Sequence, residues 1–140
     1  MLFSEHNLDT TSYQVTKTCE ETAKNLLITP TVTMASSKIE STSLWKPGGT
    51  GIITHSSITS RTKGKGADKL GRWAHHTMDG KDGRSITVVS CYQVCKKNWT
   101  KPGDMTAAAQ QTSALREAGE ADPCPRKAFC RDLAEFVTEC

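Results

Sequence analysis

The sequence lacks the patterns that would place the chain in a membrane, in a fibre or in the secretory pathway. Its longest apolar runs, such as Leu26–Ile28, fall far short of the ~20 residues that a membrane-spanning helix needs. No charged segment followed by an apolar stretch opens the chain, so we expect no signal peptide. The expected protein is intracellular, nuclear or cytoplasmic, without a membrane partner.

The sequence also lacks cysteine spacing typical of a disulfide framework or a zinc site. Among its six cysteines, Cys91 and Cys95 are separated by three residues, and Cys124 and Cys130 by five. Structural zinc sites usually use paired ligands at tighter spacing. Without a secretion signal, reduced thiols are the expected state. We therefore expect no disulfide framework.

What the chain has is an uneven distribution of charge. Its 140 residues, 36% hydrophobic and 24% charged, suit one domain or part of a larger one. The formal net charge of +3 is an average: residues 1–44 carry −2, residues 45–104 carry +7, and residues 105–140 carry −2. The basic centre is therefore the main electrostatic feature of the sequence.

Residue patterning predicts an α+β fold with a strand-rich centre. The expected strands are Met1–Glu5, Thr31–Ala35, Thr50–His55, Gly71–Met78 and Ser85–Tyr92, and the expected helices are about Thr11–Asn25, Met105–Ala118 and a segment that begins at Pro125. The turn residues Asp79–Gly83 predict a β-hairpin between the last two strands. The basic, glycine-containing segment Thr62–Gly66 is expected to be a flexible loop.

Six segments of the sequence form an ordered set of motifs: Leu2–Asn7, Lys46–Gly51, Leu70–Trp73, Ile86–Cys95, Ala109–Arg116 and Pro125–Leu133. Together these segments resemble the endonuclease/exonuclease/phosphatase superfamily, in the branch of endonuclease domains found in mobile elements that carry reverse transcriptase. The resemblance covers most of the chain and corresponds to the N-terminal part of the family domain. It implies a four-layer α/β-sandwich, two mixed sheets flanked by helices, of which residues 1–140 form a partial domain.

The resemblance also implies a chemistry and two site residues. Family members cleave phosphate esters with Mg²⁺, a cation that takes oxygen ligands. Glu5 matches the family's metal-binding glutamate, and Tyr92 matches a tyrosine near the scissile phosphate, where a phenol can donate and accept hydrogen bonds. The structural alternatives are an ordinary surface glutamate and a tyrosine packed at a strand edge.

Motifs from the second half of the family domain are missing. The sequence contains no Gly-Asp-Phe-Asn, Asn-Asp or Asp-His segment. The resemblance therefore implies a fragment of a Mg²⁺-dependent DNA endonuclease domain, truncated before its second half, with an incomplete Mg²⁺ site and no activity by itself. DNA is the expected partner of its full-length relatives.

The basic centre supports alternative hypotheses about the function of the chain. The candidate nucleic-acid-binding residues are Arg61, Lys63, Lys65, Lys69 and Arg72. They indicate, as one alternative, a non-enzymatic module that binds phosphate backbones, or simply a solvated basic face. A phosphoesterase of the same superfamily that acts on lipid or nucleotide phosphates is the other alternative. Trp73 is expected in the core, and His75 and His76 on opposite faces of one strand.

Overall fold

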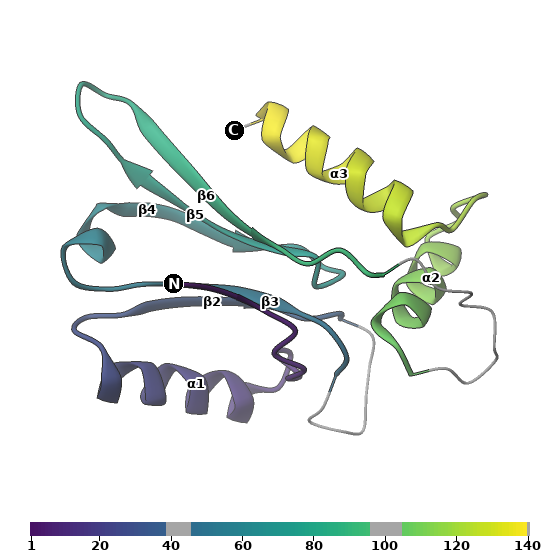
Figure 1. Ribbon diagram of the computed structural model, residues 1–140, viewed down its shortest axis with the longest axis horizontal. Helices are drawn as coiled ribbons and strands as arrows, with labels where there is room; N and C mark the ends of the chain where they lie inside the picture. Colours follow the sequence, from purple (N-terminus) through teal and green to yellow (C-terminus); the bar gives the residue numbers. More distant parts are fainter. Residues whose placement is uncertain (39–45, 96–104, 140) are drawn as a thin grey trace. The chain divides into compact units, whose positions relative to one another are not determined.

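The structure, a computed structural model, has an α+β fold and describes residues 1–38, 46–95 and 105–139. The chain forms two compact units, Met1–Tyr92 and Gln93–Cys140. The first unit holds the strands and helix α1, and the second holds helices α2 and α3 (Figure 1). Within the described ranges, no helix is both long and apolar enough to cross a membrane. The five cysteines in the same ranges are free thiols.

A first sheet contains three antiparallel strands in the order β1-β3-β2. These strands are β1 (Leu2–Ser4), β3 (Thr50–Thr54) and β2 (Thr31–Ala35). Phe3 of β1 lies opposite Gly51 of β3, and a Cβ on Gly51 would stand 2.3 Å from the Phe3 ring. Glycine at this position therefore leaves the room that the aromatic ring needs.

A second sheet also contains three antiparallel strands, in the order β4-β5-β6. These strands are β4 (Thr62–Ala67), β5 (Trp73–Asp79) and β6 (Ser85–Cys91). The expected hairpin is confirmed: β5 and β6 pair over their full length, from Trp73 opposite Cys91 to Asp79 opposite Ser85. The turn between them places Asp82 and Gly83 at φ 59° and 70°, in the left-handed region that short hairpin turns use.

The expected loop at Thr62–Gly66 is wrong, because this segment is strand β4. Its residues alternate between half-buried and exposed, with Lys63 and Lys65 on the exposed side. Gly66 lies opposite His75, and a Cβ there would stand 2.6 Å from the imidazole ring of His75. Close packing on β5 therefore requires glycine at position 66, whereas a Cβ on Gly64 would make only an ordinary contact with Thr77, at 3.5 Å.

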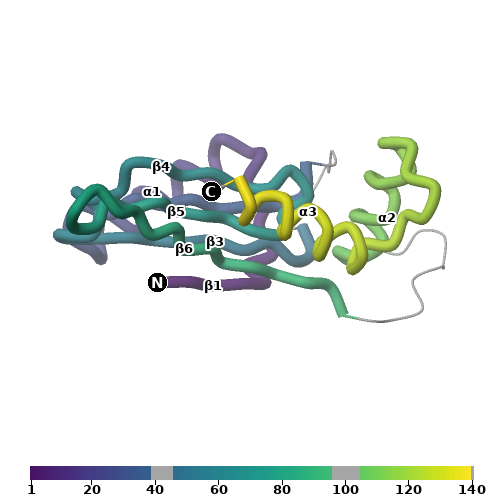
Figure 2. The backbone as a smooth tube through the Cα atoms, turned by 90° about the horizontal axis from the view of Figure 1, so that it is seen from above, coloured from purple at the N-terminus to yellow at the C-terminus, as the bar shows by residue number. Residues whose placement is uncertain are grey.

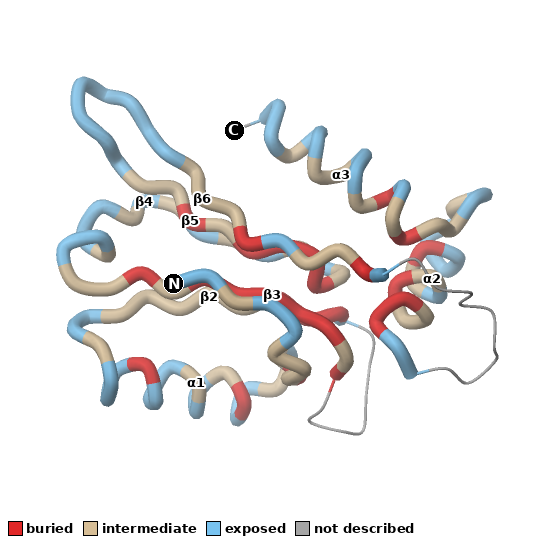
Figure 3. Tube along the Cα trace, in the orientation of Figure 1, coloured by how far each residue is buried: buried red, intermediate tan, exposed pale blue. Residues whose placement is uncertain are grey.

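The two sheets pack face to face around a small apolar cluster and several polar side chains. Ala35, Ile52 and Ala74 form a buried apolar cluster against which Val88 packs. Buried positions on facing strands of the two sheets appear red in Figure 3. Polar contacts complete the interface: fully buried His76 lies within hydrogen-bond distance of the hydroxyls of Thr33 and Thr54, at 2.9 and 3.3 Å. The interface is therefore partly apolar and partly a hydrogen-bonded network.

Helix α1 (Tyr13–Leu26) covers the other face of the first sheet (Figure 1). It buries Val15 and Ala23, while Tyr13 and Leu26 are exposed. All strand pairs in the described ranges are antiparallel, whereas mixed sheets were expected. Parallel pairs need long crossover connections. Here β2 and β3, and the three strands of the second sheet, follow one another through turns and loops, while β1 pairs with β3 and runs opposite to it.

Four strands end at the same edge of this sandwich, which we call the site end. Since β1 and β2 both run antiparallel to β3, they share one direction, as do β4 and β6 relative to β5. A hydrogen bond between Thr50 at the start of β3 and Ser90 near the end of β6 fixes the two sheets in register. The chain therefore leaves β1, β2, β4 and β6 at the site end, as Figures 1 and 2 also show.

The second unit consists mainly of two helices, α2 (Ala107–Glu117) and α3 (Pro125–Glu139). The Thr106 hydroxyl accepts a hydrogen bond from the Ala109 amide and so caps α2 at its first turn. Gly119, with φ 83°, follows the end of α2, where a glycine in the left-handed region commonly ends a helix. The Arg126 guanidinium donates to the Val94 carbonyl, which ties the start of α3 to the segment after β6.

Candidate functional site

The ends of β1 and β6 meet across the two sheets. The Thr50 and Ser90 hydroxyls lie 2.8 Å apart and donate to the Phe3 carbonyl at 2.9 and 3.3 Å. Glu5 follows Phe3 by two residues, and Tyr92 follows Ser90 by two residues. Figure 2 shows β1 and β6 on the same side of the sandwich. Both candidate residues thus leave neighbouring strands at the site end.

Glu5 presents an exposed carboxylate from a constrained backbone. Its φ is 56°, in the left-handed region that costs a residue with a Cβ roughly 1–2 kcal/mol. Its amide donates to the Gly49 carbonyl at 2.7 Å, and its carbonyl accepts from the Asn7 side chain at 3.0 Å. Backbone strain of this kind persists where surrounding contacts over-determine it, and it clusters at functional sites.

The segment Lys46–Gly49 braces the loop that follows Glu5. Asn7 and Gly48 exchange two hydrogen bonds, from the Asn7 amide to the Gly48 carbonyl at 3.0 Å and from the Gly48 amide to the Asn7 side chain at 2.8 Å. A Cβ on Gly49 would stand 2.5 Å from the His6 ring. Both ring nitrogens of His6 lie within hydrogen-bond distance of backbone groups, and burial lowers its pKa. Gly49 therefore allows the close approach of His6, the residue after Glu5, and Gly48 and Gly49 adopt the left-handed φ values of 84° and 85° that this segment requires.

A buried ion pair completes this bracing. The Lys46 ammonium lies 3.0 Å from the Asp9 carboxylate and also donates to the Ser37 carbonyl at 2.7 Å. Burial raises the pKa of Asp9, but hydrogen bonds from Thr11 and Lys46, together with the charge of Lys46, outweigh it and lower the pKa overall. Lys46 therefore acts as a structural cation and is withdrawn from solvent.

Tyr92 is half-buried. Its amide donates to the Arg72 carbonyl at 2.7 Å, which extends the β5–β6 pairing by one residue beyond β6. The tyrosine backbone is therefore held by the second sheet, as the Glu5 backbone is held by the loop beside the first sheet.

The described residues do not by themselves fit a Mg²⁺ site. No cluster of three or more His, Cys, Asp or Glu side chains that could hold a metal ion occurs in the described ranges. Glu5 supplies one exposed carboxylate, while the nearby Asp9 carboxylate is buried against Lys46. Because Mg²⁺ in proteins is usually held by one or two carboxylates together with substrate phosphates, Glu5 needs further ligands from outside this set.

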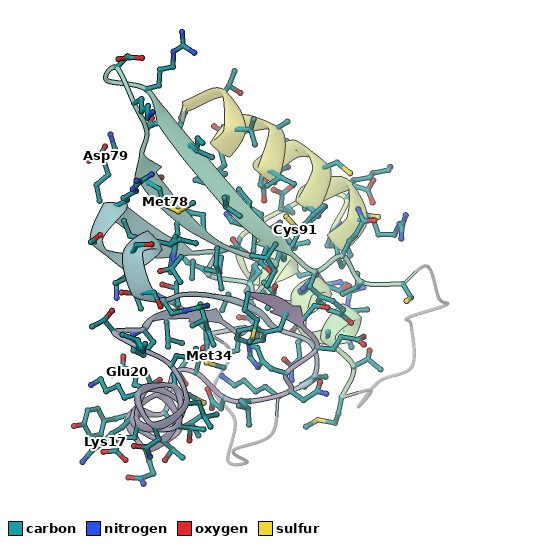
Figure 4. All side chains as sticks on the ribbon, turned by 60° about the vertical axis from the view of Figure 1, so that its left-hand side comes forward. Lys17, Glu20, Met34, Met78, Asp79 and Cys91 are labelled. Atoms are coloured by element: carbon teal, nitrogen blue, oxygen red, sulfur yellow. The ribbon has the colours of Figure 1, made fainter. Side chains whose placement is uncertain are left out.

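The five candidate nucleic-acid-binding residues separate into two groups. Arg61, Lys63, Lys65 and Lys69 are exposed on β4 or beside its ends, with Lys63 3.0 Å from Asp79; Asp79 is labelled in Figure 4. Arg72 is different, because it is only 4% exposed. Its guanidinium makes a bidentate ion pair with Asp68, at 2.8 and 3.0 Å, and lies 4.7 Å from the centre of the Trp73 ring.

Sequence reasoning placed Arg72 with the surface cations because a basic residue within a basic segment carries no sign of burial. Asp68, four residues earlier, was the available signal, because an aspartate and an arginine at this spacing can form an ion pair. Asp68 also accepts from the Leu70 and Arg72 amides at 3.0 and 3.1 Å. The expected core position of Trp73 is confirmed, as is the opposite orientation of His75 and His76.

Comparison with known proteins gives no match: no family model, no curated protein and no solved structure is similar to this chain.

Proposed function

We propose that this chain is part of a Mg²⁺-dependent phosphodiesterase domain that cuts DNA, and that these residues have no activity without further parts of that domain. The observation that carries the proposal is the meeting of the β1 and β6 ends at the Phe3 carbonyl. It brings together the two strands that the family resemblance marked as carriers of the metal-binding glutamate and the phosphate-orienting tyrosine.

In this proposal Glu5 contributes one metal ligand and Tyr92 orients a phosphate oxygen through its phenol. The left-handed backbone of Glu5 supports the first role, because an exposed side chain gains nothing in stability from that strain. The remaining metal ligands and the group that activates water belong to other parts of the domain. The four-layer architecture, with helices on both outer faces, is likewise proposed for the assembled domain.

The test starts from the DNA that encodes the chain. Reading frames downstream of residue 140 are searched for a Gly-Asp-Phe-Asn-like segment, and the extended protein is assayed for nicking of supercoiled plasmid DNA with Mg²⁺. We expect nicking by the extended protein and none by residues 1–140. Glu5→Gln is expected to lower the nicking rate about 100-fold or more, as the loss of one active-site electrostatic group does.

Glu20→Gln is the matched control, since Glu20 is an exposed glutamate that projects from α1 (Figure 4). It should leave the nicking rate unchanged. The proposal fails if no downstream frame encodes such a segment, or if Glu5→Gln and Glu20→Gln nick DNA equally well.

A second candidate function is nucleic-acid binding without catalysis. The observation that favours it is the exposure of Lys63 and Lys65 on the edge strand β4, with Arg61 before and Lys69 after it. Two lysines on one side of an edge strand can follow the phosphates of a nucleic-acid backbone. The same cations also protect this sheet edge from pairing with other chains, so the binding experiment in the Discussion decides between the two uses.

A further inference from the structure

A polar pocket of about 610 Å³ opens at the site end, on the side of β2 and β4. Its lining residues are Thr10, Thr11, Met34, Ala35, Ser36, Lys38, Ala67 and Asp68. The loop that begins at Glu5 reaches this pocket at Thr10, so one continuous segment connects the candidate site to the pocket. The volume lies within the range of roughly 300–1,000 Å³ that small-molecule sites occupy.

The lining combines two kinds of chemistry. Met34, Ala35 and Ala67 contribute aliphatic surface, against which a flat or sugar-like group can pack; Met34 is labelled in Figure 4. Thr10, Ser36 and Lys38 contribute hydroxyl and ammonium groups. A site for a small ligand typically has this composition, with apolar walls and a few polar groups that fix orientation.

Two neighbouring hydroxyls in the pocket, those of Thr10 and Ser36, share one hydrogen bond and so leave one hydroxyl proton unused by it. The Thr10 and Ser36 hydroxyls lie 2.8 Å apart, and Ser36, which is only 6% exposed, also accepts from the Thr10 amide at 3.0 Å. The shared hydrogen bond uses one of the two hydroxyl protons. No acceptor for the second proton occurs among the residues that the structure describes, so it can be donated to a ligand.

The charges around the pocket leave one cation for a ligand. The Asp68 carboxylate, although it lines the pocket, is paired with Arg72 and accepts two backbone amides. The Lys38 side chain is exposed and has no ion-pair partner in the described part of the chain. The pocket therefore favours an anionic group beside an uncharged, partly apolar one.

We propose that this pocket binds a nucleoside phosphate, with the phosphate at Lys38 and the Ser36–Thr10 hydroxyls and the nucleoside against the aliphatic side chains. The inference rests on the proposed function and deepens it, because it names where a nucleotide unit of the substrate is held. The same chemistry could come from one unit of a nucleic acid or from a free nucleotide, and the experiment separates these two sources.

The experiment is a titration of the isotope-labelled 140-residue protein, followed by amide chemical shifts at low salt without metal. The probes are uridine 5′-monophosphate, uridine, inorganic phosphate and a short single-stranded oligonucleotide. We expect saturable shifts at Thr10, Ser36 and Lys38 with the monophosphate, and weaker binding of uridine or phosphate alone. Tighter binding of the oligonucleotide assigns the pocket to a nucleic-acid unit, and tighter binding of the monophosphate assigns it to a free nucleotide.

Variants identify the pocket as the binding site. Lys38→Glu should weaken binding of the monophosphate about tenfold, the equivalent of one charge-assisted hydrogen bond. Lys24→Glu, the same charge change at an exposed position of α1, should leave it unchanged. Ser36→Ala should weaken binding as well, with the fold checked by its unchanged amide spectrum away from the pocket.

Two results would overturn the inference: absence of saturable shifts at these residues, or equal loss of binding in Lys38→Glu and Lys24→Glu. Neither result depends on Mg²⁺ or on DNA cutting. A failed pocket titration with an active, Glu5-dependent nuclease would therefore reject this inference alone, whereas an inactive extended protein that still binds the monophosphate would reject only the proposed function.

Discussion

The ammonium of Lys46 lies 3.0 Å from the carboxylate of Asp9, and the two side chains are 1% and 8% exposed. This ion pair joins the loop after β1 to the segment that leads into β3. Both partners make further hydrogen bonds, Lys46 to the Ser37 carbonyl and Asp9 to the Thr11 amide and hydroxyl. The loop that carries Glu5 is therefore anchored by an ion pair that is largely enclosed by protein.

Removing one partner of this pair should be strongly destabilising. Lys46→Met leaves the Asp9 carboxylate buried without its counter-charge, and we expect a loss of about 3–5 kcal/mol in the free energy of unfolding. Urea denaturation followed by circular dichroism measures this loss. The double variant Asp9→Asn/Lys46→Met should recover a large part of it, because no buried charge remains.

The exposed pair Lys17–Glu21, at 3.9 Å, is the control for this experiment. Lys17→Met should change the free energy of unfolding by less than about 0.5 kcal/mol, as surface pairs usually do. If Lys46→Met is as mild as Lys17→Met, the buried pair does not anchor the loop.

Stability should depend on pH through His76. Burial lowers its pKa to about 4, with the neighbouring charge of Lys65 acting in the same direction. The unfolded chain, with an ordinary histidine pKa of about 6.5, binds more protons than the folded one between these two values. The His76 contribution to stability is therefore full above pH 6.5 and is lost progressively as the pH falls to about 4.

Urea denaturation at several pH values measures this dependence. The slope from one such histidine approaches at most about 1.4 kcal/mol per pH unit. His6 and His75 also have pKa values lowered by burial, so the total slope exceeds that of His76. His76→Gln should reduce the slope in this window, whatever its effect on absolute stability. An unchanged slope would show that His76 is not neutral in the folded protein.

Local patterns in the sequence predicted most of the elements. The β-branched alternation of Thr31–Ala35 and the turn residues around Gly83 gave strands and a hairpin in the right places. The prediction was wrong at β4, where Gly64 and Gly66 suggested a loop. A sequence does not show that His75 will pack over Gly66, because that contact depends on the pairing of two strands.

The candidate site was predictable only in part. The family resemblance named Glu5 and Tyr92 as separate site residues; the two are far apart in the sequence, and no local pattern indicates that they follow neighbouring strands. The burial of Arg72 against Asp68 and of Lys46 against Asp9 could not be inferred from composition. Charged residues are usually exposed, and only the folded backbone shows which of them are enclosed.

The strained backbone at Glu5 makes a separate prediction. Glycine adopts a φ of 56° without the Cβ penalty, so Glu5→Gly should raise the free energy of unfolding by about 0.5–1 kcal/mol. Glu20→Gly, in the interior of α1, should lower it by about 1 kcal/mol. Opposite signs for the two exposed glutamates, measured by urea denaturation, would show that Glu5 is retained at a cost in stability.

The basic strand β4 makes the last prediction. If Lys63 and Lys65 contact phosphates, Lys63→Glu/Lys65→Glu should greatly weaken binding of DNA and lower the slope of log affinity against log salt by about 2, or about one per lost phosphate contact. Fluorescence anisotropy with labelled duplex and single-stranded DNA at several salt concentrations measures both quantities. Lys17→Glu/Lys24→Glu on α1 is the control with the same change of net charge.

Arg72→Gln, measured by the same anisotropy assay, tests whether Arg72 contacts DNA or is only a buried structural residue. Because its guanidinium is enclosed with Asp68, the substitution leaves a buried carboxylate unpaired and should cost about 3–5 kcal/mol in the free energy of unfolding. At temperatures where the variant is still folded, its slope of log affinity against log salt should equal that of the unmodified protein. Equal loss of binding in the β4 and α1 double variants would instead mean that net charge alone attracts DNA, and that β4 uses its lysines to protect a sheet edge.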